Sequence, residues 1–251
     1  MSDATAAEHF VDEGLIDEVI RPIKSGKEAT VLLCRANQRT TGVDLAALKV
    51  FHPRDRRDFR DESVYRAGEW IDDRRAAKAV RQRTRFGRRA AAMVWVEREW
   101  TTLGALHAAG APVPRPIART GDAILMRYVG DEAAAAPQLR SHRVSGPDEA
   151  GNLLDLVLDA VATMLRADIV HADLSPYNVL VWEGGITVID MPQAVDPRLN
   201  DHAEELLHRD MRRMCEWAGR HGVLRDAEEI AGNLWTSWLL ADLVPDHLRG
   251  L

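Results

Sequence analysis

The fold of this chain follows from the stretch HADLSPYN (residues 171–178) and the apolar run after it, which ends at Ile189-Asp190. Asp173, Asn178 and Asp190 stand in an order typical of sites that transfer phosphoryl groups. A carboxylate such as Asp173 can accept a proton from an attacking hydroxyl, and amide and carboxylate oxygens suit Mg²⁺ as ligands. A single Asp or Asn is more often a cap or a turn residue, so the interpretation depends on the surrounding pattern.

That pattern predicts a helix, a polar loop and a β-hairpin. A helical period closes at 162–168, the loop follows, and two apolar runs at 179–182 and 186–189 flank the turn Gly184-Gly185. Because a hairpin returns its two ends to one neighbourhood, Asn178 and Asp190 are expected to face the same cavity.

A loop that could hold phosphate is expected near the start of the chain. Two predicted strands, Ile20–Lys24 and Ala29–Cys34, are joined by a segment with Ser25, Gly26 and Lys27. Gly26 allows backbone N–H groups to approach phosphate oxygens, and its neighbours add a hydroxyl and a positive charge. An ordinary hairpin turn remains the alternative.

A third predicted strand, Leu45–Phe51, carries Lys49 within an apolar run. A buried lysine needs a negative partner, and Glu99 lies beside the apolar face of a helix predicted over about Arg89–Ala108. The alternative is a lysine whose alkyl chain reaches the solvent.

Taken together, these motifs resemble the RIO family of atypical protein kinases over the range from Ile20 to Trp217. The matching motifs occur in the family's order and are Ser25–Ala29, Leu48–Val50, Glu97–Glu99, Val113–Pro116, Met126–Gly130, His171–Asn178 and Ile189–Gln193.

The resemblance implies a role for each matching residue. Lys49 would hold the α- and β-phosphates of ATP, and Glu99 would hold Lys49. Asp173 would be the catalytic base, and Asn178 and Asp190 would bind Mg²⁺, with Mn²⁺ as an alternative ion.

The resemblance also implies an adenine site and a phosphorylated intermediate. Met126 would lie at the back of the adenine pocket, and the backbone of Arg127 and Val129 would hydrogen-bond the base. By the same resemblance, Asp190 would carry a phosphoryl group during turnover. The matching loop at Ser25, Gly26 and Lys27 would contact the phosphates.

We therefore expect an α+β, bilobal, protein-kinase-like fold, with a small β-sheet lobe containing one long helix and a mainly helical second lobe. The predicted segments are an acidic tail at 1–14, a first lobe at 15–128 with a basic flexible insertion at 52–89, and a second lobe at 129–251. Only a short segment follows Asp190 before a helical pattern starts near Asp201. A full activation segment, which would dock a peptide, is thus absent from the sequence.

Additional helices are predicted over 147–165, 203–220 and 226–240, and a hairpin over 117–128. Trp235, Trp238 and Leu239 are predicted to be core residues, with an exposed partner-binding stripe as the alternative.

Composition is that of an ordinary globular protein. The chain has 251 residues, of which 46% are hydrophobic and 29% charged, and a net charge of −6. Cys34 and Cys215 have no metal-ligand spacing, and neither a signal pattern nor a membrane span is evident. We expect a cytoplasmic protein without membrane contact.

The charge is unevenly distributed. The segment from Arg74 to Arg89 has eight cations and no acid. Such density predicts contact with RNA or a ribosomal particle, because Lys and Arg bind phosphates through counterion release. A mobile flap over the nucleotide is the alternative.

The predicted function is transfer of the ATP γ-phosphate to Ser/Thr of a protein substrate, to Asp190 of the enzyme itself in an ATPase cycle, or to both. One alternative is a small-molecule phosphotransferase of the aminoglycoside or choline kinase kind, which uses a similar loop. The other is an ATPase switch that gates binding to a ribonucleoprotein.

Overall fold

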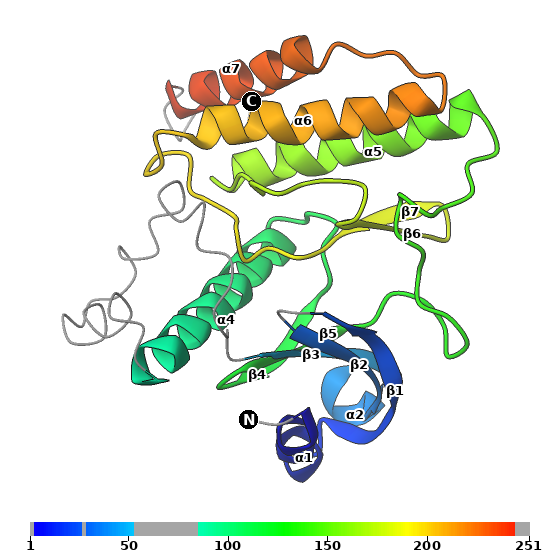
Figure 1. The fold of residues 1–251 in the computed structure, drawn as a ribbon, viewed down its shortest axis with the longest axis vertical. Coiled ribbons are helices and arrows are strands. Elements are labelled where there is room, and N and C mark those ends of the chain that lie inside the picture. The colour runs from blue at the N-terminus through cyan, green and yellow to red at the C-terminus, as the bar shows by residue number, and fades with distance from the viewer. Residues whose placement is uncertain (1–2, 27–28, 53–84, 244–251) are drawn as a thin grey trace. The chain divides into compact units, whose positions relative to one another are not determined.

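The computed structural model describes residues 3–26, 29–52 and 85–243. The chain divides into two compact units, an amino-terminal unit (1–104 and 114–135) and a carboxy-terminal unit (105–113 and 136–251). The first contains an antiparallel sheet and the second is mainly helical (Figure 1). This arrangement confirms the predicted α+β class.

A five-stranded antiparallel sheet forms the centre of the amino-terminal unit, with strand order β1-β2-β3-β5-β4. Its strands are β1 (Ile16–Ser25), β2 (Ala29–Ala36), β3 (Leu45–Phe51), β4 (Pro116–Thr120) and β5 (Ala123–Arg127).

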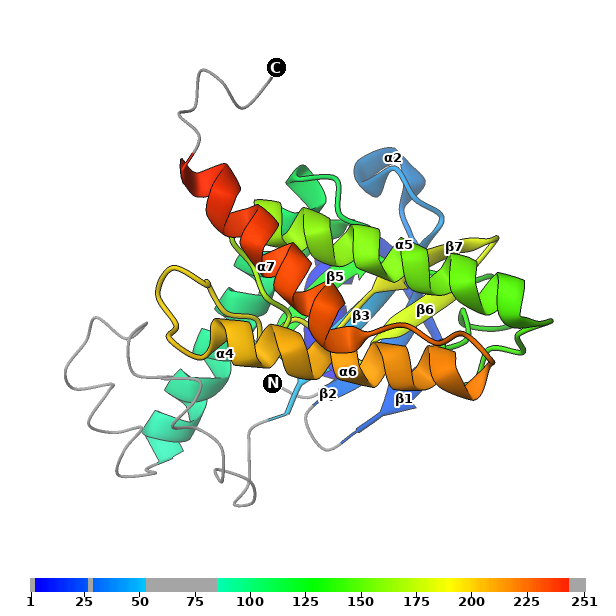
Figure 2. The same ribbon diagram turned by 90° about the horizontal axis from the view of Figure 1, so that it is seen from above.

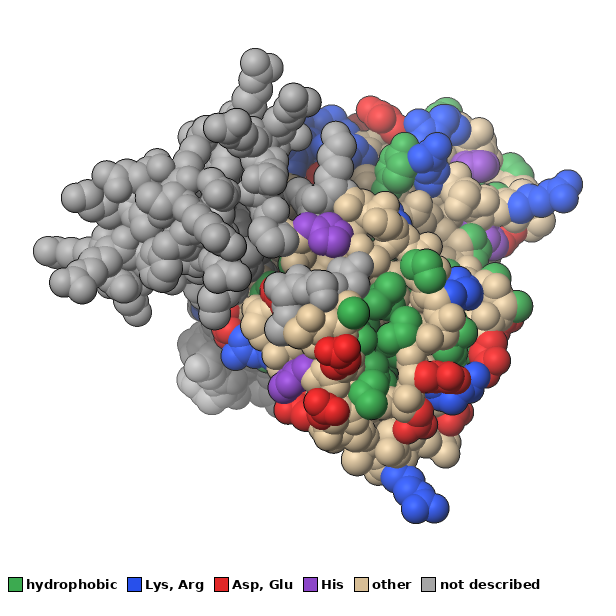
Figure 3. All heavy atoms as spheres, turned by 60° about the horizontal axis from the view of Figure 1, so that its bottom comes forward, with side chains coloured by type: hydrophobic (Ala, Val, Ile, Leu, Met, Phe, Trp, Pro, Cys, Tyr) green, Lys and Arg blue, Asp and Glu red, His purple; other side chains and the backbone are tan. Residues whose placement is uncertain are grey.

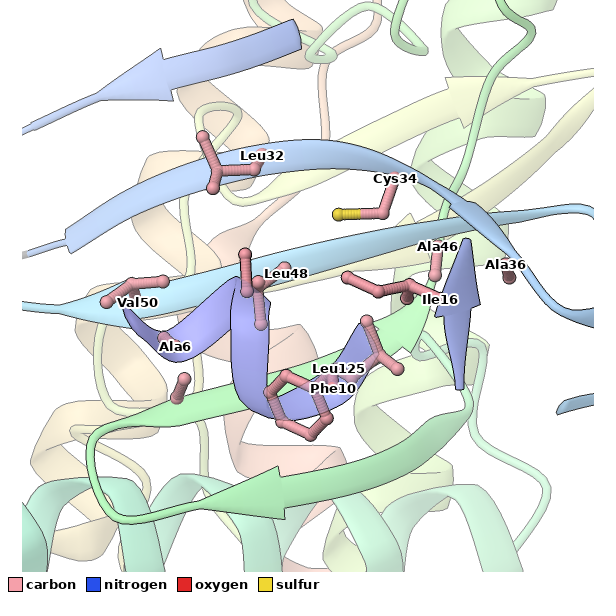
Figure 4. Packing of buried hydrophobic residues seen from close by; sticks show 12 residues of the cluster. Ala6, Phe10, Ile16, Leu32, Cys34, Ala36, Ala46, Leu48, Val50 and Leu125 are labelled. Atoms are coloured by element: carbon pink, nitrogen blue, oxygen red, sulfur yellow. The ribbon is translucent and has the colours of Figure 1, made fainter. Parts of the chain in front are cut away.

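One face of this sheet is covered by helix α1 (Asp3–Asp12). Ala6 and Phe10 of α1 are fully buried and pack with Leu48 of β3 and Leu125 of β5 (Figure 4). Most of the segment that we predicted to be an acidic tail is therefore a helix that completes the hydrophobic core.

The opposite face of β3 is turned toward helix α4 (Arg85–Ala108). Side chains alternate along a strand, so Leu48 and Val50 face α1 while Lys49 points the other way, to Glu99 of α4. The last residues of the predicted flexible insertion, 85–89, belong to α4, whereas 53–84 lie outside the described residues.

A short helix, α2 (Gln38–Thr41), joins β2 to β3. The Asn37 side chain accepts a hydrogen bond from the N–H of Arg39, and Gly42 adopts a left-handed conformation at the end of the helix. Because Arg115 donates to the carbonyl of Thr41, this connection is tied to the segment before β4.

Three helices pack against one another in the carboxy-terminal unit: α5 (Pro147–Arg166), α6 (Ala203–Arg220) and α7 (Ala227–Leu243) (Figures 1 and 2). Apolar residues at helical spacing line the buried side of α5, including Leu154, Val157 and Val161. Pro147 occupies the first turn of α5, where the missing N–H has no intrahelical partner to lose.

The predicted hairpin is present as β6 (Val179–Trp182) and β7 (Gly185–Val188). Its loop is Glu183-Gly184, with φ of 50° and 78° respectively. Positive φ at both residues is the signature of a type I′ turn, whose twist matches that of the flanking strands.

The aromatic residues of α7 are only half-buried. The rings of Trp235 and Trp238 lie 4.8 Å apart, and Trp238 Nε1 donates to Asp168 Oδ1 at 3.0 Å. Leu239 is 44% exposed, so the prediction that it belongs to the core is wrong. The two tryptophans contact each other and Trp238 also contacts the loop after α5, while Leu239 lies on the outer side of the helix.

Acidic and basic side chains surround a strip of hydrophobic ones on the face shown in Figure 3. Such a mixture is usual, because apolar atoms supply much of any folded surface. None of the helices in the described ranges has both the length and the apolar character needed to cross a membrane.

Candidate active site

Lys49 and Glu99 form a nearly buried ion pair in the amino-terminal unit. The Nζ atom lies 2.7 and 2.9 Å from the two carboxylate oxygens, and the side chains are 13% and 4% exposed. Lys49 Nζ also lies 4.9 Å from the ring centroid of Phe51. Lys49 is therefore paired with Glu99, as predicted, and the alternative of a lysine that extends into the solvent is wrong.

The predicted phosphate loop starts where β1 ends. Ser25 is the last residue of β1, and the N–H of Gly26 donates to the carbonyl of Ala29 at 2.9 Å. Both Ser25 and Gly26 are exposed, and Lys27 lies outside the described residues. The role of this loop in binding phosphate remains a prediction.

The predicted adenine-binding segment continues β5. Met126 is buried, while the N–H of Arg127 donates to the carbonyl of Arg115 at 2.8 Å. Because its N–H is used in this way, we expect Arg127 to contact an adenine base through its carbonyl. Val129 is half-buried and precedes Gly130, which forms an isolated β-bridge with Ala135.

The loop around Asp173 is braced by a buried imidazole. His171 lies with Nε2 3.1 Å from the carbonyl of Ile189, and its Nδ1 accepts from the N–H of Asp173 at 3.3 Å. The carbonyl fixes Nε2 as the protonated nitrogen. Burial lowers the pKa of His171, which keeps the ring neutral in this role. His171 is therefore a structural residue that connects the loop to the end of β7.

Asn178 and Asp190 are brought together by the hairpin. Asn178 Nδ2 donates to the carbonyl of Asp173 at 3.0 Å, and the N–H of Ile189 donates to the carbonyl of Asn178 at 2.9 Å. The amide nitrogen of Asn178 is engaged, which leaves its Oδ1 as a hard donor near the exposed Asp190. Oxygen donors of this kind fit Mg²⁺. Among the described residues, no group of three or more His, Cys, Asp or Glu side chains is arranged to hold a metal ion without further ligands.

Ala172 in the loop and Asp190 after β7 have left-handed backbone conformations. Ala172 has φ 62° and Asp190 has φ 70°. This conformation costs a non-glycine residue about 1–2 kcal/mol, so other contacts must hold it. Arg209 supplies one such contact, because its guanidinium donates to the carbonyl of Ala172.

Helix α6 supports the loop through three charged residues that sequence reasoning missed. The first is Arg209. The second, Asp210, is 1% exposed, and its carboxylate accepts a hydrogen bond from the N–H of Leu174. The third is Arg213, whose Nη1 lies 2.9 Å from Asp173 Oδ1. Asp210 occurs among buried apolar residues of α6. The sequence could have indicated the role of Asp210, because an acid on the apolar face of an amphipathic helix needs a specific partner.

Burial raises the pKa of Asp210 to about 7, because desolvation penalises its charged form more than Arg209 and Arg213 favour it. Arg213 is 3.8 Å from Asp210 Oδ1 and much closer to Asp173. Arg213 therefore acts mainly on the carboxylate of Asp173.

The structure thus assembles two groups of predicted site residues. Lys49 and Glu99 meet within the amino-terminal unit. Within the carboxy-terminal unit, Asn178 is hydrogen-bonded to Asp173 and to Ile189, the residue before Asp190. That both groups bind one nucleotide stays a prediction.

Comparison with known proteins identifies the family of this chain. The RIO domain matches residues 32–230. The RIO-type serine/threonine-protein kinase Rio1 of Haloferax volcanii is 32% identical over 232 residues, which span 91% of this chain and 73% of the relative. Rio1 of Thermoplasma acidophilum is 38% identical over 139 residues, or 55% of this chain and 70% of the relative.

A solved structure of similar fold is the Rio2 kinase-ADP/Mg²⁺-phosphoaspartate complex from Chaetomium thermophilum. It aligns with a TM-score of 0.62 and 19% identity over 98% of this chain and 72% of that protein. The fold and site thus define a protein-kinase-like phosphotransferase, as predicted. Within that class, the chain belongs to the RIO family of atypical protein kinases.

Proposed function

We propose that this enzyme binds ATP with Mg²⁺ and transfers the γ-phosphate either to a serine or threonine hydroxyl of a protein or to its own Asp190. The observation that carries the proposal is the connected set of Asp173, Asn178 and Asp190, which the loop and hairpin hold together. Bound Mg²⁺, or alternatively Mn²⁺, would neutralise charge on the transferred phosphoryl group.

Asp173 is suited to act as a base. Arg213 binds its Oδ1, while Oδ2 has no hydrogen-bond partner in the described part of the chain. Oδ2 can therefore accept the proton of an attacking hydroxyl. The neutral ring of His171 and the helix residues behind the loop orient this carboxylate before substrate arrives.

Lys49 would neutralise phosphate charge from the other unit. Glu99 holds the ammonium through both of its oxygens, so the lysine is already positioned and desolvated. A cation in this state interacts more strongly with phosphate than one in bulk water.

Asp190 is the second candidate acceptor. Its side chain is exposed, and its left-handed backbone conformation sets it apart from an ordinary strand residue. In this route a carboxylate oxygen of Asp190 forms a bond to the γ-phosphorus as the bond to ADP breaks. Water then hydrolyses the acyl phosphate, which yields an ATPase cycle.

The test is to incubate the purified protein with Mg²⁺ and γ-labelled ATP, with and without cell extract. Acid-stable label on extract proteins supports Ser/Thr transfer, and label on the enzyme that hydroxylamine releases supports Asp190. Free labelled phosphate supports the ATPase cycle. Label on a small metabolite would instead support the aminoglycoside or choline kinase-like alternative.

A further inference from the structure

A positively charged pocket lies beside the loop that carries Asp173. Its volume is about 430 Å³, and all of its lining residues belong to the carboxy-terminal unit. The loop contributes Ser175, Pro176 and Tyr177 to the wall, and the carboxy-terminal half of α6 contributes most of the remainder.

Three arginines line this pocket, Arg140, Arg213 and Arg220, against a single acid, Glu216. Arg213 is bound to Asp173. Neither Arg140 nor Arg220 has an ion pair with a carboxylate among the described residues. Two of the three cations therefore remain available to an external anion.

Arg140 is held in place by contacts with the loop. Its backbone N–H donates to the carbonyl of Pro176 at 3.0 Å, and its guanidinium lies 4.4 Å from the ring centroid of Tyr177. Gln138 Nε2 donates to the carbonyl of Tyr177 at 2.7 Å. These contacts orient the arginine in advance, which reduces the entropy lost when it binds a ligand.

The pocket and the proposed base share one residue. Arg213 lines the pocket, and its Nη1 lies 2.9 Å from Asp173 Oδ1. An acceptor hydroxyl at Asp173 would place the neighbouring residues of an extended peptide, spaced by about 3.3 Å, within reach of the pocket.

We propose that this pocket binds an acidic or phosphorylated side chain of the protein substrate, a few residues from the Ser or Thr that accepts phosphate. The inference rests on the proposed kinase function and adds a substrate class to it. Guanidinium groups match the planar geometry of carboxylate and phosphate oxygens, so the pocket selects anionic peptides over neutral ones.

An RNA phosphate is the competing ligand, and the surroundings favour a peptide. RNA binding needs cations spread along a backbone, whereas here Glu216 lies in the pocket and Glu204 and Glu205 are exposed on the same helix. An acid therefore lies among the cations of the pocket, which suits a short anionic segment of a peptide better than a continuous phosphate backbone.

The test compares peptides that contain one acceptor serine in an alanine-rich background. One series carries Asp at each position from four residues before to four after the serine, a second carries phosphoserine there, and the reference peptide carries only alanine. We expect one or two positions at which the anion raises kcat/KM by about tenfold or more. The ratio of the anionic to the neutral peptide within one enzyme cancels any general change in activity.

Arg140→Gln and Arg220→Gln, singly and combined, should return that ratio toward one. Arg143→Gln is the matched control, because Arg143 is an exposed arginine that does not line the pocket, and it should keep the ratio. Equal phosphorylation of anionic and neutral peptides by the unaltered enzyme would overturn the pocket's role and leave the kinase function intact.

Binding supplies a readout that does not need turnover. With fluorescently labelled peptides, we expect phosphoserine or aspartate to tighten binding about tenfold, and the double variant to lose this gain. Equal affinities overturn the proposal even if no peptide is phosphorylated. A poly(U) RNA that binds through Arg140 and Arg220, without any peptide preference, would assign the pocket to RNA instead.

Discussion

The ammonium nitrogen of Lys49 lies between the two carboxylate oxygens of Glu99, at 2.7 and 2.9 Å. The pair bridges β3 and α4 where both side chains are largely shielded from water. Removing one charge from such a pair leaves the other without compensation.

Glu99→Gln should lower the free energy of unfolding by about 3 kcal/mol and weaken ATP turnover, because Lys49 loses the group that positions it. Urea unfolding and steady-state turnover measure the two effects. Glu97→Gln on the same helix is the control, since Glu97 is 51% exposed and its pair with Arg119 should contribute about 1 kcal/mol or less. Equal losses in both variants would contradict a special role for Glu99.

Asp173→Asn should leave ATP affinity nearly unchanged and reduce turnover by roughly 10²–10⁴-fold, because the proton acceptor is lost while the cations remain. Calorimetry with ATP and release of labelled phosphate measure these quantities separately. Asp201→Asn, at an exposed position before α6, should change neither. Full turnover by Asp173→Asn would remove this carboxylate from the mechanism.

Asp210→Asn should alter how stability depends on pH. The raised pKa, about 7 in the folded protein, means that the folded state holds a proton that the unfolded chain releases near its ordinary value. The stabilisation by this proton is complete at low pH and is lost as pH rises from about 4 to about 7. The unfolding free energy of the natural protein minus that of Asp210→Asn should therefore fall over this range and level off above it.

His171 changes stability in the opposite direction, because its lowered pKa makes acid favour the unfolded chain. Both proteins contain His171, so the difference between their urea curves at each pH isolates Asp210. A difference that stays constant from pH 4 to 8 would show that Asp210 is not protonated in the folded state.

Glu183→Asn should raise the free energy of unfolding by about 0.5–1 kcal/mol. Glu183 has φ 50° in the β6–β7 turn, a conformation that asparagine tolerates better than glutamate. Glu183→Gln is the control, since it removes the charge and keeps the long side chain. A comparable gain in both variants would assign the effect to charge and not to the turn.

The elements with clear periodicity were predictable from the sequence. β3 spans Leu45–Phe51 and α6 spans Ala203–Arg220, as expected, because each combines a regular apolar pattern with a clear boundary. The hairpin that carries Asn178 and Asp190 was also predictable, but its turn is Glu183-Gly184 and not the predicted Gly184-Gly185. Gly185 instead pairs with Trp182 as the first residue of β7.

Other features depend on tertiary contacts that no local pattern reveals. Acidic neighbours conceal the spacing of Ala6 and Phe10 in α1, so the helix resembles a solvated tail. Arg209 and Arg213 resemble ordinary charges on a helix surface until the loop that they bind is in place. Only the fold shows which charged residues of an amphipathic helix serve a site.

Helix α1 has a practical consequence for handling this protein. Ala6 and Phe10 cover the face of the sheet from which Leu48 and Leu125 project (Figure 4). A truncated chain that begins at Leu15 would expose this hydrophobic surface to solvent. Such a protein should aggregate, although it keeps every residue proposed to take part in phosphoryl transfer.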